Sequence, residues 1–342
     1  MQANPSPTAD AAASFPPAVG DQPAPPRELG LFASFALTMS IICILAGGVT
    51  SFHTGLCSVG GAAIGIGWPV FCVLSLVVAL TMGQVVSAFP RAGGPCEWAA
   101  ELGGAGWGWV AGCFNLLGLV TATAAVNIGL CRFVVGSVER ILDFEQVTPP
   151  IWIVPSLVVA ATISQAFINH RGIRLTTRLT NFSGYLIMIT AVAFTLLMLV
   201  CAWSAGNLDF ARLITFENFS GEAGKDTWPA SASMAWLFAL GLLMPAYTLT
   251  GFDGAAQMAE ETRDPERNVP KGIWQAVLIS GVAGWIMLCA VVLAAPDLSE
   301  AAKLGDGAFV FIIRVATPRW THAICYTCIS VAMYLCGLAC VT

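Results

Sequence analysis

A carboxylate lies inside an apolar stretch near residue 250, where "MPAYTLTGFDGAAQMAEET" spans residues 244 to 262. Asp253 there stands between Gly251 and Gly254, two residues that weaken a helix. An acid at the centre of a membrane helix costs about 2.5–3.5 kcal/mol on insertion scales, so it calls for a compensating partner. Asp253 could bind a cation from substrate, ion or proton, or it could cap the backbone N–H groups of a restarting helix. Its position after Gly251, where a half-helix would restart, favours capping.

The residue sets that would indicate an enzyme are missing from this sequence. It has three histidines, and the patterns G-x-S-x-G, HExxH and GxxxxGK[ST] do not occur. Most of the 12 cysteines, including the C-x-x-C pair Cys325 and Cys328, stand in apolar runs, where cysteine behaves as a small hydrophobic residue. We therefore expect no enzyme, no metal site, no cofactor and no nucleic-acid partner. An ATP-driven pump is excluded because the sequence contains no nucleotide-binding domain.

A second interruption lies in the first apolar run, "LFASFALTMSIICILAGGVTSFHTGL". The adjacent glycines Gly47 and Gly48 weaken a helix by about 2 kcal/mol relative to alanine. We expect helix up to Leu45, and non-helical backbone near the middle of the membrane at Gly47, Gly48 and Gly251. Close helix packing is the alternative explanation of the glycine pair. Two interrupted helices, the first and the sixth, are typical of secondary transporters with inverted repeats, whose freed amides can bind a substrate carboxylate.

The elements that must position these residues are membrane helices. The chain is 57% hydrophobic and only 10% charged, too few charges for a water-facing surface, so it is a multi-pass integral membrane protein. Eight windows reach or approach the roughly 20 apolar residues that a spanning helix needs. They are 31–56, 68–88, 106–131, 151–168, 182–204, 233–258, 273–295 and 321–342. The run 307–316 is too short to span, and we expect an interfacial or lid helix there.

Residues 1–28 are rich in Pro and Ala and lack the charged and apolar regions of a signal peptide, so they predict a disordered cytoplasmic tail. The acid-free basic stretch "HRGIRLTTR" (170–178) predicts a loop, and its charge favours a cytoplasmic position and hence a cytoplasmic N-terminus. The sequence also stops inside the eighth apolar window without a polar tail, which indicates a fragment of a longer protein.

Four stretches together resemble the amino acid–polyamine–organocation permeases. These are "TMSIICILAGGVTSF", the "GWP" at 67–69, "FPRAGGPCEWAAEL" and "PAYTLTGFDGAAQMAEETRDPERNVPKGI". The match is closest to the amino acid/choline branch, which includes GABA and choline permeases. The resemblance implies an all-α integral membrane fold of two inverted five-helix repeats (the LeuT/APC type), with helices 1 and 6 broken around the substrate. Residues 29–342 would form this permease domain, with the second repeat incomplete because the fold needs ten helices.

By position, the resemblance implies a set of substrate-binding residues. They are Ala46, Gly47, Gly48, Val49 and Thr50 in the first helix, and Tyr247, Thr250, Gly251, Phe252 and Asp253 in the sixth. The implied function is secondary active transport of an amino acid, GABA or a related small amine across the lipid bilayer, by alternating access around a midplane site. A proton or cation could drive it. The alternatives are a choline or polyamine transporter, a substrate sensor, or a fragment that does not transport.

Overall fold

The structure, a computed structural model, describes residues 29–90, 93–141 and 150–342; the predicted tail of residues 1–28 lies outside them. Throughout the described residues the secondary structure is helical, apart from one isolated β-bridge between Leu29 and Thr262. The longer helices are α1 (Leu31–Ile42), α2 (Ile44–Val59), α3 (Trp68–Ala88), α4 (Pro95–Gly103), α5 (Ala105–Ile141), α6 (Ile153–His170), α7 (Ile173–Ser204), α8 (Met234–Gly241), α11 (Pro265–Ala294), α13 (Ala308–Ala316) and α14 (Arg319–Val341). The shorter ones are η2 (Ala63–Gly67), η3 (Phe210–Leu213), η4 (Gly221–Gly224), α9 (Leu243–Thr248), α10 (Gly254–Gln257), η5 (Ala259–Glu261), α12 (Leu298–Ala302) and η6 (Gly305–Gly307).

Seven helices in the described part of the chain are long and apolar enough to cross a membrane. They are Leu31–Val59, Ala63–Ala88, Ala105–Val138, Ile153–His170, Arg174–Ser204, Pro265–Ala294 and Arg319–Val341. The predicted sixth window is instead a shorter apolar stretch, Met234–Thr248, because its helix is interrupted. The predicted short helix between the last two windows is α13, which is separate from α14.

The prediction of a loop over residues 170–178 is wrong for most of this stretch, which is helical. α6 ends at His170, and α7 already begins at Ile173, so Arg174 and Arg178 lie on the first turns of a long helix. Only the connection is non-helical, and Gly172 makes it possible with a φ of +110°. The predicted apolar window 182–204 covers the apolar part of α7 but not the more polar first turns, which begin at Ile173.

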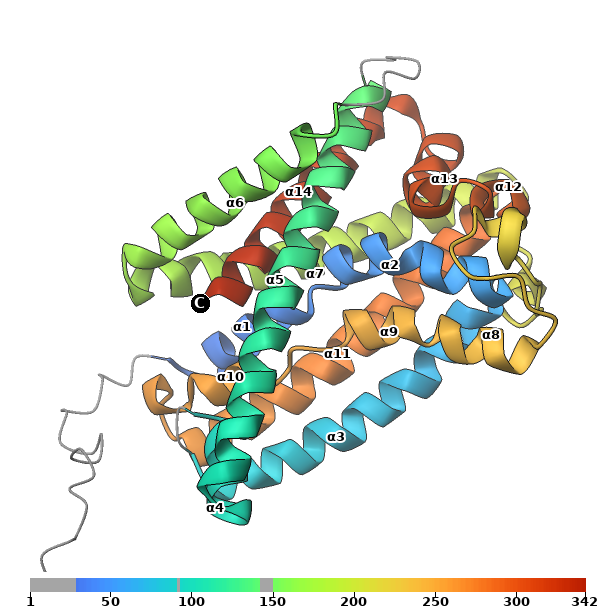
Figure 1. Cartoon of the computed structure of the whole chain (residues 1–342). Coiled ribbons are helices and arrows are strands. Elements are labelled where there is room, and N and C mark those ends of the chain that lie inside the picture. Colours follow the sequence, from blue (N-terminus) through green and yellow to red (C-terminus); the bar gives the residue numbers. More distant parts are fainter. Residues whose placement is uncertain (1–28, 91–92, 142–149) are drawn as a thin grey trace, which may run out of the picture.

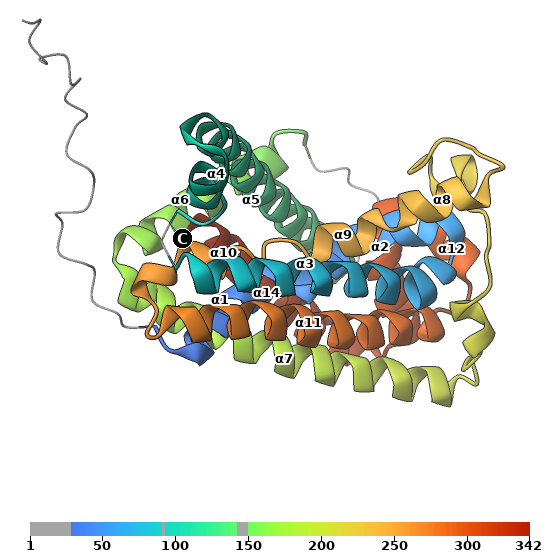
Figure 2. The same ribbon diagram turned by 90° about the horizontal axis from the view of Figure 1, so that it is seen from below.

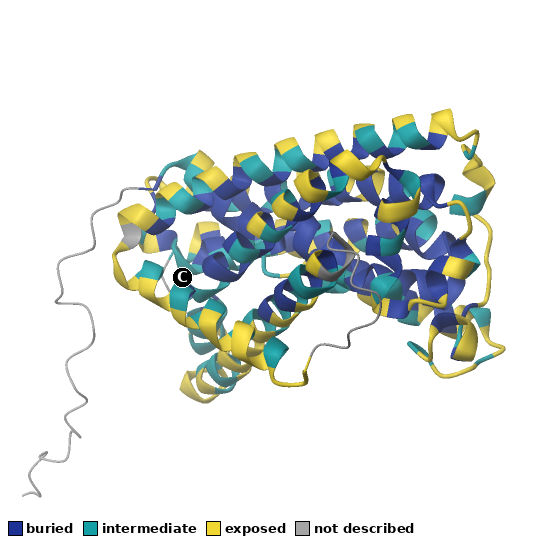
Figure 3. Ribbon diagram, turned by 90° about the horizontal axis from the view of Figure 1, so that it is seen from above, coloured by how far each residue is buried: buried dark blue, intermediate teal, exposed yellow. Residues whose placement is uncertain are grey.

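The helix pair α1–α2 runs through the middle of the bundle (Figures 1 and 2). α1 packs against α7, α11 and α14, whereas α2 packs against α8 and α9. The buried residues gather along these central helices, and the outer faces of the bundle are exposed (Figure 3). Large apolar side chains such as Phe114 and Ile163 lie on the exposed faces, as expected for helices whose solvent is lipid.

A buried amide pair joins α5, α6 and α14. Asn127 Nδ2 donates to Gln165 Oε1 at 2.8 Å, and Gln165 Nε2 donates back to Asn127 Oδ1 at 3.0 Å. Gln165 Nε2 also donates to the carbonyl of Tyr334 at 3.1 Å, and both amide side chains are fully buried. Gly337 leaves room for them, because a Cβ at that position would lie 2.6 Å from Asn127 Oδ1. Polar pairs of this kind hold membrane helices together.

Candidate functional site

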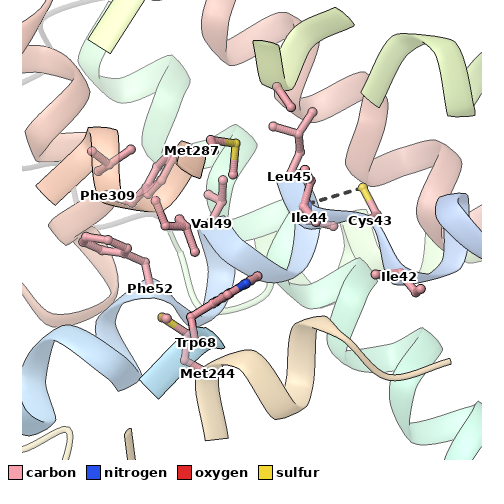
Figure 4. Close-up of a cluster of buried hydrophobic side chains, with 14 of the residues drawn as sticks. Ile42, Cys43, Ile44, Leu45, Val49, Phe52, Trp68, Met244, Met287 and Phe309 are labelled. Carbon is pink, nitrogen blue, oxygen red and sulfur yellow. Dashed lines mark hydrogen bonds between the residues drawn. The ribbon is translucent and has the colours of Figure 1, made fainter. Parts of the chain in front are cut away.

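The first interruption lies at Cys43, between α1 and α2. Cys43 has φ 22° and ψ 87°, a conformation that non-glycine residues seldom adopt. Its N–H donates to the carbonyl of Met39 at 3.0 Å and closes α1. Its thiol accepts from the N–H of Ala46 at 3.4 Å, one of the first-turn groups of α2 that have no partner within the helix. Figure 4 shows Cys43 where the ribbon leaves the helical path.

The prediction of non-helical backbone at Gly47 and Gly48 is wrong, because both glycines lie inside α2. The N–H of Gly47 donates to the carbonyl of Cys43 at 2.9 Å, as in a regular helix. A Cβ on Gly47 would lie 2.8 Å from Thr248 Cα, so the glycine lets α2 approach α9 closely. Gly48 faces Leu288 of α11 on the apolar side. The glycine pair therefore serves helix packing, the alternative explanation from the sequence.

The second interruption lies between α9 and α10, as predicted. α9 ends at Thr248, and α10 restarts at Gly254. Gly251 between them has φ +86°, in the left-handed region that favours glycine, so the predicted non-helical backbone at this residue is confirmed. Tyr247 lies on the last turn of α9, before the interruption, and Thr250 is exposed within it.

The two interruptions meet at Ile41. This residue lies two positions before Cys43, and its side chain packs on Gly251 and Gly254. A Cβ at Gly251 would lie 2.5 Å from Ile41 Cγ2. The absence of side chains at the two glycines therefore allows the interrupted helices to touch where each has lost its helical hydrogen bonds.

Hydroxyl groups line the contact between α2 and the sixth-helix segment. Ser51 Oγ donates to the carbonyl of Gly47 at 2.6 Å and lies 3.3 Å from Thr248 Oγ1. Thr50 Oγ1 donates to the carbonyl of Ala46 at 2.8 Å, within α2. Ser51 and Thr248, which were not among the predicted site residues, thus make a side-chain hydrogen bond between α2 and α9.

The remaining first-helix candidates lie in different surroundings. Val49 packs with Met287 and Phe309 in the apolar core (Figure 4), and Ala46 is buried in the same core cluster. The first turn of α2 nevertheless leaves backbone N–H groups near the interruption. Of these groups the N–H of Ala46 is taken by the Cys43 thiol, and Val49 lies beyond the first turn, so neither residue brings a free N–H group to the interruption.

The Asp253 carboxylate does not cap α10. It immediately precedes that helix, but its backbone is already helical, and it makes no side-chain capping hydrogen bond. Oδ2 instead accepts from Gln257 Nε2 at 3.3 Å, one turn further along. Among the described residues no lysine or arginine forms an ion pair with it. The capping interpretation is therefore wrong, and the carboxylate keeps the capacity to bind a cation.

Three cysteines surround the first interruption, which sequence reasoning missed. The thiol of Cys336, on α14, donates to the carbonyl of Ile41 at 3.4 Å, and the thiol of Cys43 donates to the carbonyl of Ala332 on the same helix at 3.8 Å. Cys340 lies one turn after Cys336 on α14. The sequence holds no signal for this grouping, because α14 is distant in the chain and its cysteines read as ordinary apolar residues.

Both ends of the interrupted helices are covered. At the C-terminal end of α2, Trp228 Nε1 donates to the carbonyl of Thr54 at 2.8 Å. At the other end, the segment before α1 pairs with the segment after α10. There, the N–H of Leu29 donates to the carbonyl of Glu261 at 3.0 Å, and the N–H of Arg263 donates to the carbonyl of Leu29 at 2.8 Å. Backbone hydrogen bonds thus join the first and sixth helices outside their contact at Ile41.

Two touching interrupted helices in an all-helical membrane protein are typical of the folds of secondary transporters. Residues 29–342 match the family model for amino acid permeases, and the chain belongs to this family. The match confirms the predicted resemblance, and the family is one of permeases rather than of enzymes, as expected. The structure confirms the all-helical fold with an interruption in the first and in the sixth apolar window.

Individual relatives are similar over most of this chain. The amino-acid permease BAT1 homolog of Oryza sativa subsp. japonica is 30% identical over 331 residues, which cover 92% of this chain and 62% of the relative. The amino-acid permease BAT1 of Arabidopsis thaliana is 28% identical over 340 residues, which cover 92% of this chain and 63% of the relative. The chain thus spans about three fifths of the length of these relatives. Among solved structures, Mhp1, a nucleobase-cation-symport-1 family transporter, is similar at 12% identity and a TM-score of 0.45, over 92% of this chain and 64% of Mhp1.

Proposed function

We propose that the protein is a secondary active permease for an amino acid or a related small amine, working by alternating access. The observation that carries this proposal is the meeting of two interrupted helices, with Ile41 packed on Gly251 and Gly254. Interrupted helices free backbone groups that would otherwise pair within the helix, and such groups can hold a ligand inside a membrane. Membership in the amino acid permease family supports the substrate class.

The two poles of a zwitterion have different partners in this proposal. The substrate carboxylate takes the first-turn amides of α2 at Ile44 and Leu45, where the helix dipole is positive. The substrate amine takes the Asp253 carboxylate, which has no cationic partner among the described side chains. Tyr247 lies just before the sixth-helix interruption and Phe252 lies within it, and the two supply aromatic faces for the cation.

The other predicted site residues enter the proposal in three ways. Thr50 and Thr250 offer hydroxyl groups. Gly251 supplies non-helical backbone. Gly47, Gly48 and Val49 hold α2 against its neighbours and act on binding through its position.

Proteoliposome uptake tests the proposal. The purified protein and empty liposomes are compared with a panel of radiolabelled amino acids, GABA, choline and a polyamine. GABA belongs to the panel because the GABA-specific permease of Saccharomyces cerevisiae is 25% identical over 308 residues, and choline because the choline transporter of the same yeast is 26% identical over 299 residues. We expect concentrative uptake of at least one amino acid or GABA under a proton or cation gradient. Uptake no greater than in empty liposomes for the entire panel would refute the proposal, and uptake of choline alone would replace the substrate class.

A cytoplasmic N-terminus completes the proposal. Arg174 and Arg178, on the first turns of α7, then lie on the cytoplasmic side with the basic residues of the 263–271 segment. Protease protection of a tag placed before Leu29, in sealed vesicles of known orientation, decides this point.

A further inference from the structure

The thiols at the first interruption form crossed hydrogen bonds between α14 and the α1–α2 junction. Cys336 Sγ donates to the carbonyl of Ile41 at 3.4 Å, and Cys43 Sγ donates to the carbonyl of Ala332 at 3.8 Å. Ala332 lies one helical turn before Cys336, so the two thiols lie side by side where α1 stops. Both are buried, with exposed fractions of 0% for Cys43 and 1% for Cys336.

A third thiol extends this pair along α14. Cys340 is four residues after Cys336, so the two side chains are neighbours on one face of α14. Cys340 is partly exposed, unlike the other two. All three are free thiols.

Cys336 lies between the other two cysteines. Its neighbours are Cys43, across the contact between α14 and the α1–α2 junction, and Cys340, one turn further along α14. In the described part of the chain, no three histidine, cysteine or acidic side chains are placed to hold a metal ion. The arrangement therefore suits a ligand that needs two thiols in contact, and not an ion that needs three or four donors.

We propose that Cys336 and Cys340 form a dithiol site for monosubstituted trivalent arsenicals, R–As=O. Two As–S bonds form, the bond between arsenic and oxygen breaks, and the two thiol protons leave with that oxygen as water. No electron is transferred, so the step needs no oxidant. Cys340 is the entry point because it is the partly exposed member of the pair.

Binding at this site acts on the interrupted helix. Once its sulfur is bonded to arsenic, Cys336 no longer donates to the carbonyl of Ile41, and the organic group lies beside the contact between the two interruptions. The arsenical therefore blocks transport. This consequence rests on the proposed function, whereas the binding of the arsenical does not.

A second cysteine pair on α14 provides a matched control. Cys325 and Cys328 are three residues apart on the same helix, so their side chains are neighbours on one face of it. Cys325 precedes Cys340 by 15 residues, roughly 22 Å along a helix, so it lies far from the interruption. An arsenical bound there leaves the hydrogen bond to Ile41 intact.

Binding is tested with phenylarsine oxide on the purified full chain, by the mass of the intact protein. The Cys328→Ala variant serves as the background, because it removes the control pair. We expect it to carry a phenylarsine adduct that 2,3-dimercaptopropanol removes and a monothiol does not. Adding either Cys340→Ala or Cys336→Ala should abolish that adduct. An adduct that survives Cys340→Ala overturns the proposed pair, and an adduct that survives both substitutions overturns a site at this interruption.

Inhibition is tested by uptake, with each variant compared to its own untreated rate. Phenylarsine oxide should remove most of the uptake by the wild type and by Cys328→Ala, and 2,3-dimercaptopropanol should restore it. Cys340→Ala should retain its uptake under the same treatment. Equal inhibition of Cys340→Ala and Cys328→Ala would overturn the link between this dithiol and transport. Failure of the untreated protein to take up any substrate refutes the proposed function instead, and the adduct result still decides the dithiol.

Discussion

Substituting Gly251 by alanine perturbs the contact between the two interruptions in two separable ways. The φ of +86° at Gly251 lies in the left-handed region, where a Cβ costs about 1–2 kcal/mol. The same Cβ would lie 2.5 Å from Ile41 Cγ2, so the neighbouring side chain must move. Overpacking of this kind costs about 1–3 kcal/mol, and the two effects together amount to about 2–5 kcal/mol.

Two companion variants separate the causes. Ile41→Ala removes Cγ2, so in combination with Gly251→Ala it should recover the steric part of the loss and leave the torsional part. Gly118→Ala is the matched control. Gly118 is exposed and lies in the middle of α5, and no atom lies within 4 Å of an added Cβ. There, alanine should stabilise the helix by up to about 1 kcal/mol.

The assay is the apparent melting temperature of the detergent-solubilised protein, together with proteoliposome uptake. Gly251→Ala should melt well below the wild type and lose uptake, whereas Gly118→Ala should match or exceed the wild type in both. If Gly251→Ala melts with the control and transports normally, the contact at Ile41 is not what holds the interrupted helices in place.

Three further outcomes follow from the same contacts. Asp253→Asn should impair uptake as severely as Asp253→Leu, because the carboxylate caps no helix and pairs with no lysine or arginine among the described residues, which leaves its charge for the substrate amine; substantial uptake by the asparagine variant would contradict that role. Gly337→Ala should lower the melting temperature, because the added Cβ would collide with the buried amide of Gln165; an unchanged melting temperature would mean that the amide pair tolerates displacement. Arg263→Pro should be less stable than Arg263→Ala by about 0.5–1.5 kcal/mol, since only proline removes the N–H that donates to Leu29; equal melting would show that this hydrogen bond adds nothing.

The membrane helices and the sixth-helix interruption could be predicted from the sequence. A bilayer imposes runs of about 20 apolar residues, and such runs are visible in any hydropathy pattern. The sixth-helix interruption carried both an acid and a glycine that adopts a positive φ, two features that local sequence reveals.

The first interruption could not be placed from the sequence, because tertiary contacts decide its position. Gly47 and Gly48 have the weakest helix propensity in that run, yet close packing against α9 and α11 keeps them helical. The chain leaves the helix at Cys43 instead, where α14 supplies a thiol to the freed carbonyl of Ile41. Propensity is a weak prior, and a partner 295 residues away in the sequence overrides it here.

The central claim is that substrate is held between the interrupted helices. Its most direct test is equilibrium binding of the radiolabelled substrate to purified protein. The substrate is the compound selected by uptake, and the proteins are the wild type, Asp253→Leu and the control Gly118→Ala. We predict saturable binding to the wild type and to Gly118→Ala, and none to Asp253→Leu. Equal binding to all three proteins would contradict the account and place the substrate elsewhere in the bundle.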